Sequence, residues 1–178
     1  GDILGWDVCL CDSEPATLMA NGEFIVGQCQ DNLNSVFTSL KAFEESEEAN
    51  MEKQQIDMFV AFDNEENGSE NRCGASSIFL DSVIERIHNS LFAGSNPQSL
   101  DILKARSILF SVDAAHATHP NINKMEKNHP IHLNSGPVMK QNAAQKYLSD
   151  GYLRLLISKV ADDIPIQCFV GRQDIRGG

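Results

Sequence analysis

The sequence is short of basic residues and has no long apolar run. Its 178 residues include 14 Lys and Arg against 25 Asp and Glu, so the formal net charge is −11. A chain this acidic is repelled by phosphate backbones and anionic lipid headgroups, so we expect neither nucleic acid nor a membrane as a partner. The sequence has no apolar stretch near about 18 residues and no signal-peptide pattern, which predicts a soluble protein.

Cysteine usage excludes two further classes. The chain has five cysteines, an odd number, and no Cys-x-x-Cys pair. This pattern argues against a disulfide framework and against a structural zinc site, and it favours free thiols in a reducing compartment. We therefore predict a cytoplasmic protein. A length of 178 residues is enough for one domain with a real hydrophobic core.

Strand-like and helix-like segments alternate along the chain. Apolar runs predict strands at residues 3–10, 24–26, 56–62, 107–112 and 166–170. Apolar residues at helical spacing predict helices at residues 32–44, 74–92 and 144–160, and we expect His88 on the surface of the second helix. Such alternation predicts an α/β fold with a mostly parallel sheet flanked by helices.

Acidic residues follow three of these apolar runs. Asp31 comes after residues 24–26, Glu65 and Glu66 follow residues 56–62, and Asp113 ends residues 107–112. Open α/β sheets place their chemistry at the carboxyl ends of strands, and adjacent glutamates there repel each other unless a cation lies between them. We expect these acids to converge on a metal site. The alternatives are a solvated acidic loop and, for each aspartate, the N-cap of the next helix.

Several motifs occur in a definite order. They are Asp7…Cys9-Leu10…Asp12-x-Glu14-Pro15-Ala16, Glu23-Phe24-Ile25…Asp31-Asn32-Leu33, Asp63-Asn64-Glu65-Glu66-x-Gly68-Ser69, Val112-Asp113-x-Ala115-His116-Ala117-x-His119-Pro120-Asn121, Gly136-Pro137-Val138-x-Lys140 and Phe169-Val170-x-Arg172-x-Asp174-x-Arg176-Gly177-Gly178. In this order they resemble the aspartyl aminopeptidase family of dinuclear zinc exopeptidases over nearly the whole chain. The resemblance implies an incomplete zinc-exopeptidase-like α/β fold. Residues 1–22 would be the tail of the family's dimerisation domain, and residues 23–178 the central part of its catalytic domain.

The resemblance implies roles for the acids. Asp31 would bridge two zinc ions, Glu66 would complete the carboxylate set of one ion, and Asp113 that of the other. Glu65, beside a ligand, would be the general base that takes a proton from water and passes it to the leaving amine.

The resemblance also implies roles for three basic side chains. Lys140 would pair with the acidic side chain of the peptide's first residue, and the alternative is a solvated surface lysine. His116 and His119 would orient the metal carboxylates or stabilise their turn rather than bind the ions themselves.

The chain departs from the family in its ligands. Family members are longer and use one histidine before and another after the matched region, and His129 and His132 lie in the wrong motif to replace them. The three remaining carboxylates offer oxygen ligands alone, which suit magnesium or calcium better than zinc. Cys29 stands where the family has an arginine, and Asn67 where it has an aliphatic residue. We expect the chain to be part of a longer protein. Taken as a whole polypeptide, it should expose apolar surface and associate or misfold.

The resulting functional hypothesis is a metal-dependent aminopeptidase that removes N-terminal, preferably acidic, residues from peptides. It would use two zinc ions and form a homo-oligomer, and we expect the 178-residue chain alone to be inactive. One alternative is a non-catalytic remnant that keeps the fold and assembles with partner subunits. A related metal-dependent deacylase or amidohydrolase would fit the carboxylates but not the full set of motifs.

Overall fold

A computed structural model describes residues 1–49, 55–119, 121, 129–143, 145, 147 and 150–171. The chain divides into two compact units, Gly1–Ala61 with Ile108–Ala114 as unit 1 and Phe62–Ser107 with Ala115–Gly178 as unit 2. These units group residues by their contacts, and the predicted domain boundary after residue 22 stays a prediction. Among the described helices, none is both long and apolar enough to cross a bilayer.

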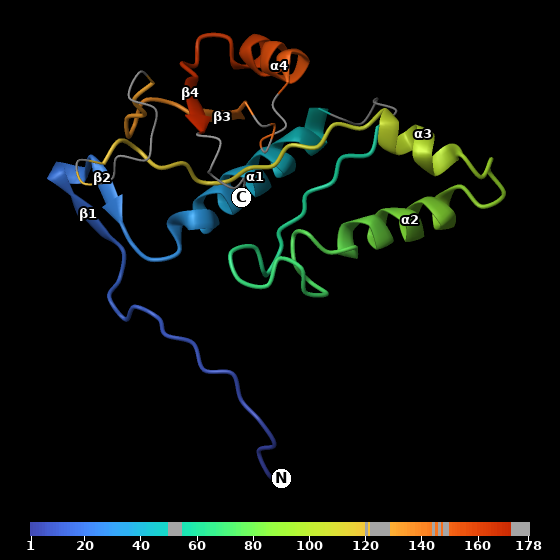
Figure 1. The fold of residues 1–178 in the computed structure, drawn as a ribbon, viewed down its shortest axis with the longest axis horizontal. Helices are drawn as coiled ribbons and strands as arrows, with labels where there is room; N and C mark the ends of the chain where they lie inside the picture. Colours follow the sequence, from blue (N-terminus) through green and yellow to red (C-terminus); the bar gives the residue numbers. More distant parts are fainter. Residues whose placement is uncertain are drawn as a thin grey trace. The chain divides into compact units, whose positions relative to one another are not determined.

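Unit 1 begins its regular structure with a hairpin that leads into a long helix (Figure 1). Strand β1 (Thr17–Met19) pairs antiparallel with β2 (Phe24–Val26), and the 3-10 turn Ala20–Gly22 connects them. Helix α1 (Gln30–Ala49) follows. The predicted strand at residues 24–26 is confirmed, and α1 contains the helix predicted at residues 32–44.

Three predicted strands are absent from the described structure. Residues 3–10, 56–62 and 107–112 have no regular secondary structure. A strand requires a hydrogen-bonded neighbour as well as apolar residues, and no such ladder partner lies within the described ranges. An apolar run indicates a preference for burial but does not supply the neighbour. Residues 56–61 still pack locally, because the Phe59 ring lies 6.3 Å from the Phe43 ring of α1.

Two helices of unit 2 hold a histidine that the sequence predicted to be exposed. Helix α2 (Phe79–Leu91) is followed by α3 (Ser99–Ala105). His88 is only 7% exposed, its ring lies 5.3 Å from that of Phe92, and its Nε2 is 2.9 Å from Ser99 Oγ. The prediction that His88 lies on the surface is wrong. Helical spacing shows which residues share a face of α2, but it does not show that α3 covers the face that contains His88.

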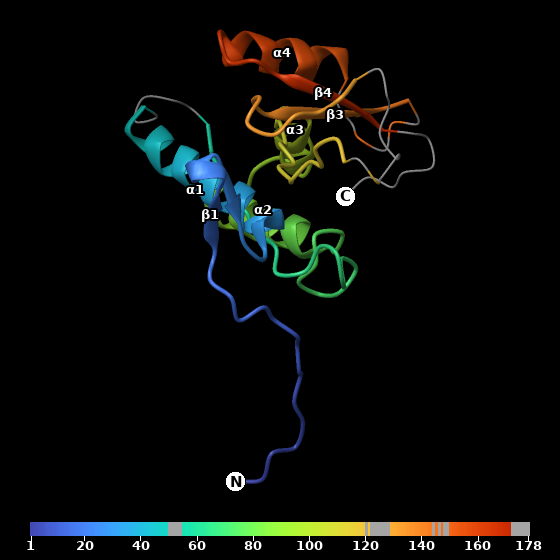
Figure 2. The same cartoon turned by 90° about the vertical axis from the view of Figure 1, so that its left-hand side faces the viewer.

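A parallel strand pair forms the second part of unit 2. Strand β3 (Val138–Asn142) pairs with β4 (Gln167–Gly171), and α4 (Gly151–Ala161) lies between them in sequence and beside them in both views (Figures 1 and 2). Asp150 caps α4 by accepting a hydrogen bond from the Leu153 amide at 2.8 Å. The predicted last strand is confirmed. The predicted helix at residues 144–160 corresponds to α4, but residues 144, 146, 148 and 149 lie outside the described part.

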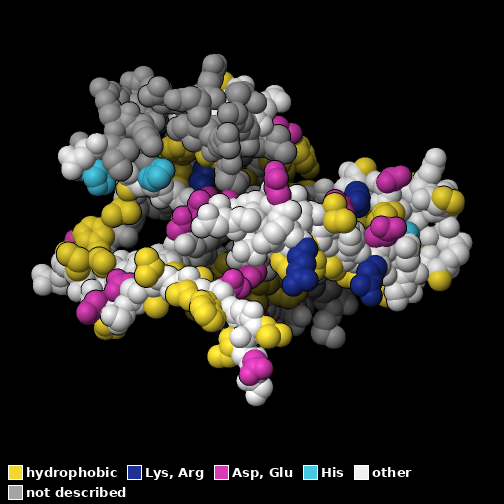
Figure 3. Space-filling view, turned by 60° about the horizontal axis from the view of Figure 1, so that its bottom comes forward, with side chains coloured by type: hydrophobic (Ala, Val, Ile, Leu, Met, Phe, Trp, Pro, Cys, Tyr) yellow, Lys and Arg dark blue, Asp and Glu magenta, His cyan; other side chains and the backbone are white. Residues whose placement is uncertain are grey.

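Little apolar surface is buried. Within the described residues, the buried apolar side chains are Ile131 and Phe169, at 3% and 6% exposure. Many large apolar side chains remain exposed, including Leu4 at 98%, and Figure 3 shows apolar side chains beside acidic ones on one face of the molecule. The expectation of exposed apolar surface is therefore confirmed. Such side chains gain stability only when another surface removes them from water.

Candidate metal centre

Asp31 lies at the entry to α1, where the backbone is held by neighbouring groups. Asp31 and Asn32 have non-helical dihedral angles, so regular helix begins after them. The Leu33 amide donates to the Cys29 carbonyl at 3.1 Å, and Gln30 Nε2 donates to the Ile25 carbonyl at 3.0 Å. The positive end of the helix dipole favours a carboxylate at this position.

Asp113 is brought to the same part of unit 1. Asn32, directly after Asp31, donates from Nδ2 to the carbonyl of Val112, directly before Asp113, at 3.0 Å. The two bonded residues are 80 positions apart in sequence, and Asp113 itself is half-buried. The tertiary fold therefore joins two of the three segments that were predicted to carry metal ligands. The donor chemistry of this pair, two carboxylates, fits a divalent cation.

Glu65 and Glu66 lie on a compact loop of unit 2. The Ala75 amide donates to the Asn64 carbonyl and the Ser76 amide to the Ser69 carbonyl, both at 3.0 Å. Ser69 Oγ donates to the Glu65 carbonyl. These bonds fix the backbone of residues 63–77 and leave both glutamate side chains exposed.

Gly74 is the residue that lets this loop close. A Cβ at Gly74 would lie 2.0 Å from the Ser69 carbonyl oxygen and 2.5 Å from the Gly68 carbonyl oxygen. Only glycine leaves room for backbone to approach backbone this closely. The loop that presents Glu65 and Glu66 thus depends on a glycine next to the cysteine at position 73.

The two histidines of the predicted turn are exposed, and one has a defined tautomer. His119 Nδ1 accepts a hydrogen bond from the Asn121 amide at 3.1 Å. Because Nδ1 must then be unprotonated, neutral His119 carries its proton on Nε2, which can donate but has no lone pair for a metal. The role of His119 as an orienting residue stays a prediction. His116 is exposed in the same segment.

Lys140 occupies the centre of β3, opposite buried Phe169 in the register. Its Nζ lies 5.8 Å from the centroid of the Tyr147 ring, and that ring packs edge-on against Phe169 at 6.3 Å. A cation over an aromatic face is attracted by the ring quadrupole. Lys140 is half-buried, and its role in substrate binding stays a prediction. No spacing rule links Tyr147 to Lys140, so the sequence alone does not indicate this contact.

The predicted ligands are divided between the two units. Asp31 and Asp113 belong to unit 1, whereas Glu65, Glu66 and Lys140 belong to unit 2. No group of three or more His, Cys, Asp or Glu side chains suited to one metal ion occurs among the residues that the structure describes. The convergence of Asp31, Glu66 and Asp113 stays a prediction.

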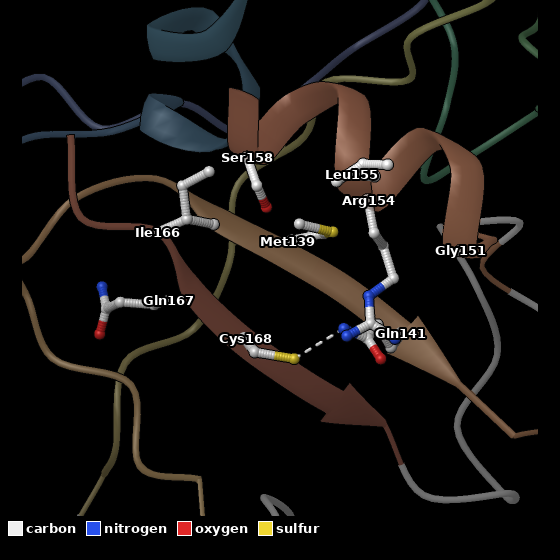
Figure 4. Close-up of a pocket in the computed structure, with 9 residues that line it drawn as sticks. All are labelled: Met139, Gln141, Gly151, Arg154, Leu155, Ser158, Ile166, Gln167 and Cys168. Atoms are coloured by element: carbon white, nitrogen blue, oxygen red, sulfur yellow. Dashed lines mark hydrogen bonds between the residues drawn. The ribbon is translucent and has the colours of Figure 1, made fainter. Parts of the chain in front are cut away.

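A shallow pocket occurs in unit 2. It has a volume of about 530 Å³ and is lined by β3, β4, α4 and the residue before β4. Arg154 of α4 extends toward Gln141, whose Nε2 donates to Cys168 Sγ at 2.8 Å (Figure 4). The pocket contains none of the predicted site residues, so it does not bear on the proposed chemistry.

Comparison with known proteins identifies the family. The sequence matches the family described as "Aminopeptidase I zinc metalloprotease (M18)" over residues 1–178. The chain belongs to this family. The expected membership among zinc aminopeptidases is thereby confirmed.

Individual relatives agree with this assignment. The chain is 33% identical over 99% of its length to a probable M18 family aminopeptidase 2 from Pseudomonas syringae pv. tomato. It is 35% identical over 98% of its length to the aspartyl aminopeptidase of Dictyostelium discoideum. It spans only 39% and 38% of these two relatives.

A solved structure confirms the fold class. The chain resembles part of a cryo-EM structure of the Ape4 and Nbr1 complex with a TM-score of 0.77 and 36% sequence identity. The similarity covers 94% of this chain and 32% of that one. The predicted zinc-exopeptidase-like α/β fold, incomplete in this chain, is therefore confirmed.

Proposed function

We propose that this chain is the central part of a metal-dependent aminopeptidase that removes N-terminal, preferably acidic, residues from peptides. The observation that carries the proposal is the 3.0 Å bond from Asn32 to Val112 in a chain of the M18 family. It ties together the segments of two predicted metal ligands, Asp31 and Asp113. If Asp31 and Asp113 were unrelated surface acids, nothing would require their two segments to lie side by side.

Asp31 would be a ligand of both zinc ions, Glu66 would complete the carboxylate set of one ion, and Asp113 that of the other. When bound, zinc supplies a Lewis acid that acidifies water and polarises the peptide carbonyl. Glu65 then acts as general base, since its carboxylate takes the proton of the attacking water and returns it to the departing amine. The loop of residues 63–77 holds the Glu65 backbone in place, as its carbonyl accepts from Ser69 Oγ.

Lys140 would set the preference for acidic substrates. Its ammonium is oriented over the Tyr147 ring at 5.8 Å, and it would pair with the carboxylate of the peptide's first side chain. A charge-assisted contact of this kind is stronger than a neutral hydrogen bond. A leucyl peptide would leave the ammonium without that partner, so it would bind less tightly.

The test uses the full-length protein and its Glu65→Gln variant. We expect the wild type to cleave aspartyl and glutamyl peptides faster than leucyl ones, and not to cleave peptides with a blocked amino group. Glu65→Gln should lower the rate by roughly 10²–10⁴-fold while zinc content, measured by mass spectrometry, stays near wild type. The control is Glu70→Gln, a change of an exposed acid in the same loop, which should leave both values unchanged.

Four outcomes would contradict parts of this proposal. Full activity in Glu65→Gln would remove Glu65 as the base, and loss of zinc in that variant would make it a ligand instead. Cleavage of amino-blocked peptides would favour the alternative deacylase or amidohydrolase. A wild type that hydrolyses no peptide but assembles with other subunits would favour the non-catalytic alternative.

We further propose that the protein is cytoplasmic and works as a homo-oligomer. The exposed apolar side chains of the described residues support association, since a second protein surface would remove them from water. The 178-residue chain alone, with oxygen ligands only, should be inactive even with excess zinc.

A further inference from the structure

The Asn32 side chain makes a contact that no sequence pattern indicated. Its Nδ2 donates to the Val112 carbonyl at 3.0 Å across 80 positions of sequence. Each end of this hydrogen bond is one residue from a predicted metal ligand, Asp31 on one side and Asp113 on the other. Both segments lie within unit 1, so the contact belongs to a single compact part of the molecule.

Hydrogen bonds within the same segment of chain hold the backbone around Asn32 in place. The Leu33 amide donates to the Cys29 carbonyl, and Gln30 Nε2 donates to the Ile25 carbonyl. The direction of the Asn32 side chain is therefore set by a fixed entry to α1. The hydrogen bond to Val112 transmits this fixed position to the segment 108–114.

The geometry at this position calls for a neutral hydrogen-bond donor. Asn32 Oδ1 is buried and has no hydrogen-bond partner within the described part of the chain, so the acceptor end of the side chain gains nothing from this placement. The donor end does, since it satisfies the Val112 carbonyl. An aspartate of the same shape would turn a carboxylate oxygen toward that carbonyl and would add a negative charge next to Asp31 and Asp113. Both effects would push the two segments apart.

We propose that Asn32 is a positioning residue that fixes the spacing between Asp31 and Asp113 and thereby sets the affinity for the metal pair. The inference rests on the proposed function, because it takes both aspartates as ligands. Asn32 itself binds neither metal nor substrate. Groups that orient metal ligands from behind typically change metal affinity by about 10–100-fold when they are removed.

The experiment compares Asn32→Asp and Asn32→Ala with wild type in the full-length protein. Zinc affinity is measured by calorimetric titration of the metal-free protein, and the visible spectrum of the cobalt-substituted protein reports ligand geometry. We expect both variants to bind zinc roughly 10–100-fold more weakly and to show an altered cobalt spectrum, with circular dichroism unchanged. The matched control is Asn34→Asp, which adds the same charge at an exposed position of α1 and should bind zinc like the wild type.

A conservative variant separates positioning from folding. Asn32→Ser keeps a donor on a shorter side chain and should retain more zinc affinity than Asn32→Ala. Failure of all three Asn32 variants to fold would make the residue structural and overturn the proposal. If Asn32→Ala binds zinc within about twofold of wild type, the positioning role of Asn32 is also overturned. The proposed function would then still stand, provided that the wild type cleaves peptides. A wild type that binds no zinc and cleaves no peptide would overturn both.

Discussion

Replacing Gly74 with alanine should disrupt the loop that presents Glu65 and Glu66. An added Cβ would lie 2.0 Å from the Ser69 carbonyl oxygen, whereas real Cβ atoms essentially never come closer than 3.0 Å. The obstacle is backbone, which cannot rotate away as a flexible side chain could. The Ser69 carbonyl would have to move by roughly 1 Å.

The size of the effect follows from what that movement breaks. The Ser69 carbonyl accepts the Ser76 amide at 3.0 Å, and a shift of this size takes the bond beyond good geometry. Overpacking costs about 1–3 kcal/mol, and a lost backbone hydrogen bond adds about 0.5–1.5 kcal/mol. We therefore expect a destabilisation of about 2–4 kcal/mol. This corresponds to a drop in Tm of roughly 4–16 °C if the loop unfolds with a cooperative unit of about 150–250 residues, and to a smaller drop if a larger unit unfolds with it.

Thermal unfolding and amide hydrogen exchange of the full-length protein measure this effect. Gly74→Ala should lower Tm and increase exchange at Ser76. If Glu65 is the base of the proposed peptidase, the activity should fall as well, because Glu65 loses its fixed position. The control is Gly151→Ala at the start of α4, where an added Cβ would meet no atom within 4 Å. Wild-type Tm and wild-type protection at Ser76 in Gly74→Ala would refute the steric argument.

Two further predictions concern local interactions of unit 2. Asp150→Ala removes the acceptor of the Leu153 amide and should destabilise the protein by about 0.5–2 kcal/mol in urea unfolding. Asp150→Asn keeps an acceptor oxygen and should retain most of this stability. Equal losses of stability in both variants would contradict the capping role of Asp150. The hydrogen bond to Asp81 raises the pKa of Lys104 above 10.5, so the stabilisation from this pair is fully present below that pH and is lost as pH rises through the raised pKa. The Tm difference between wild type and Lys104→Met should thus be the same at about pH 6 and about pH 9, and it should shrink above about pH 11. A Tm difference that changes between about pH 6 and about pH 9 would contradict this assignment to Lys104.

The sequence was sufficient for features that depend on near neighbours. Apolar residues at helical spacing indicated α1 and α2, and the apolar run before the C-terminus indicated β4. The acids after apolar runs, together with the order of the motifs, were enough to indicate the family. Periodicity is set by the geometry of a single helix or strand, so a local stretch of sequence contains the information.

The predictions that failed concern partners distant in sequence. Residues 56–62 and 107–112 have the composition of strands, but strand formation also requires a neighbouring backbone. His88 has the spacing of an exposed helical residue, yet Ser99 of α3 lies against it. For the apolar runs and for His88, the outcome depended on which other segment lies beside the residues, and this neighbour cannot be identified from the local sequence.

Only the tertiary structure revealed how parts of the candidate site are held. The sequence indicated Asp31, Asp113 and a motif that includes Asn32, but it did not indicate the contact of Asn32 with Val112, because a hydrogen bond across 80 positions leaves no periodic trace. Likewise, no motif indicated that Tyr147 lies beside Lys140 and packs against Phe169 of β4. Sequence chemistry determines which groups can act, whereas chain folding brings those groups together, since hydrogen bonds and ring contacts depend on distances in space rather than along the chain.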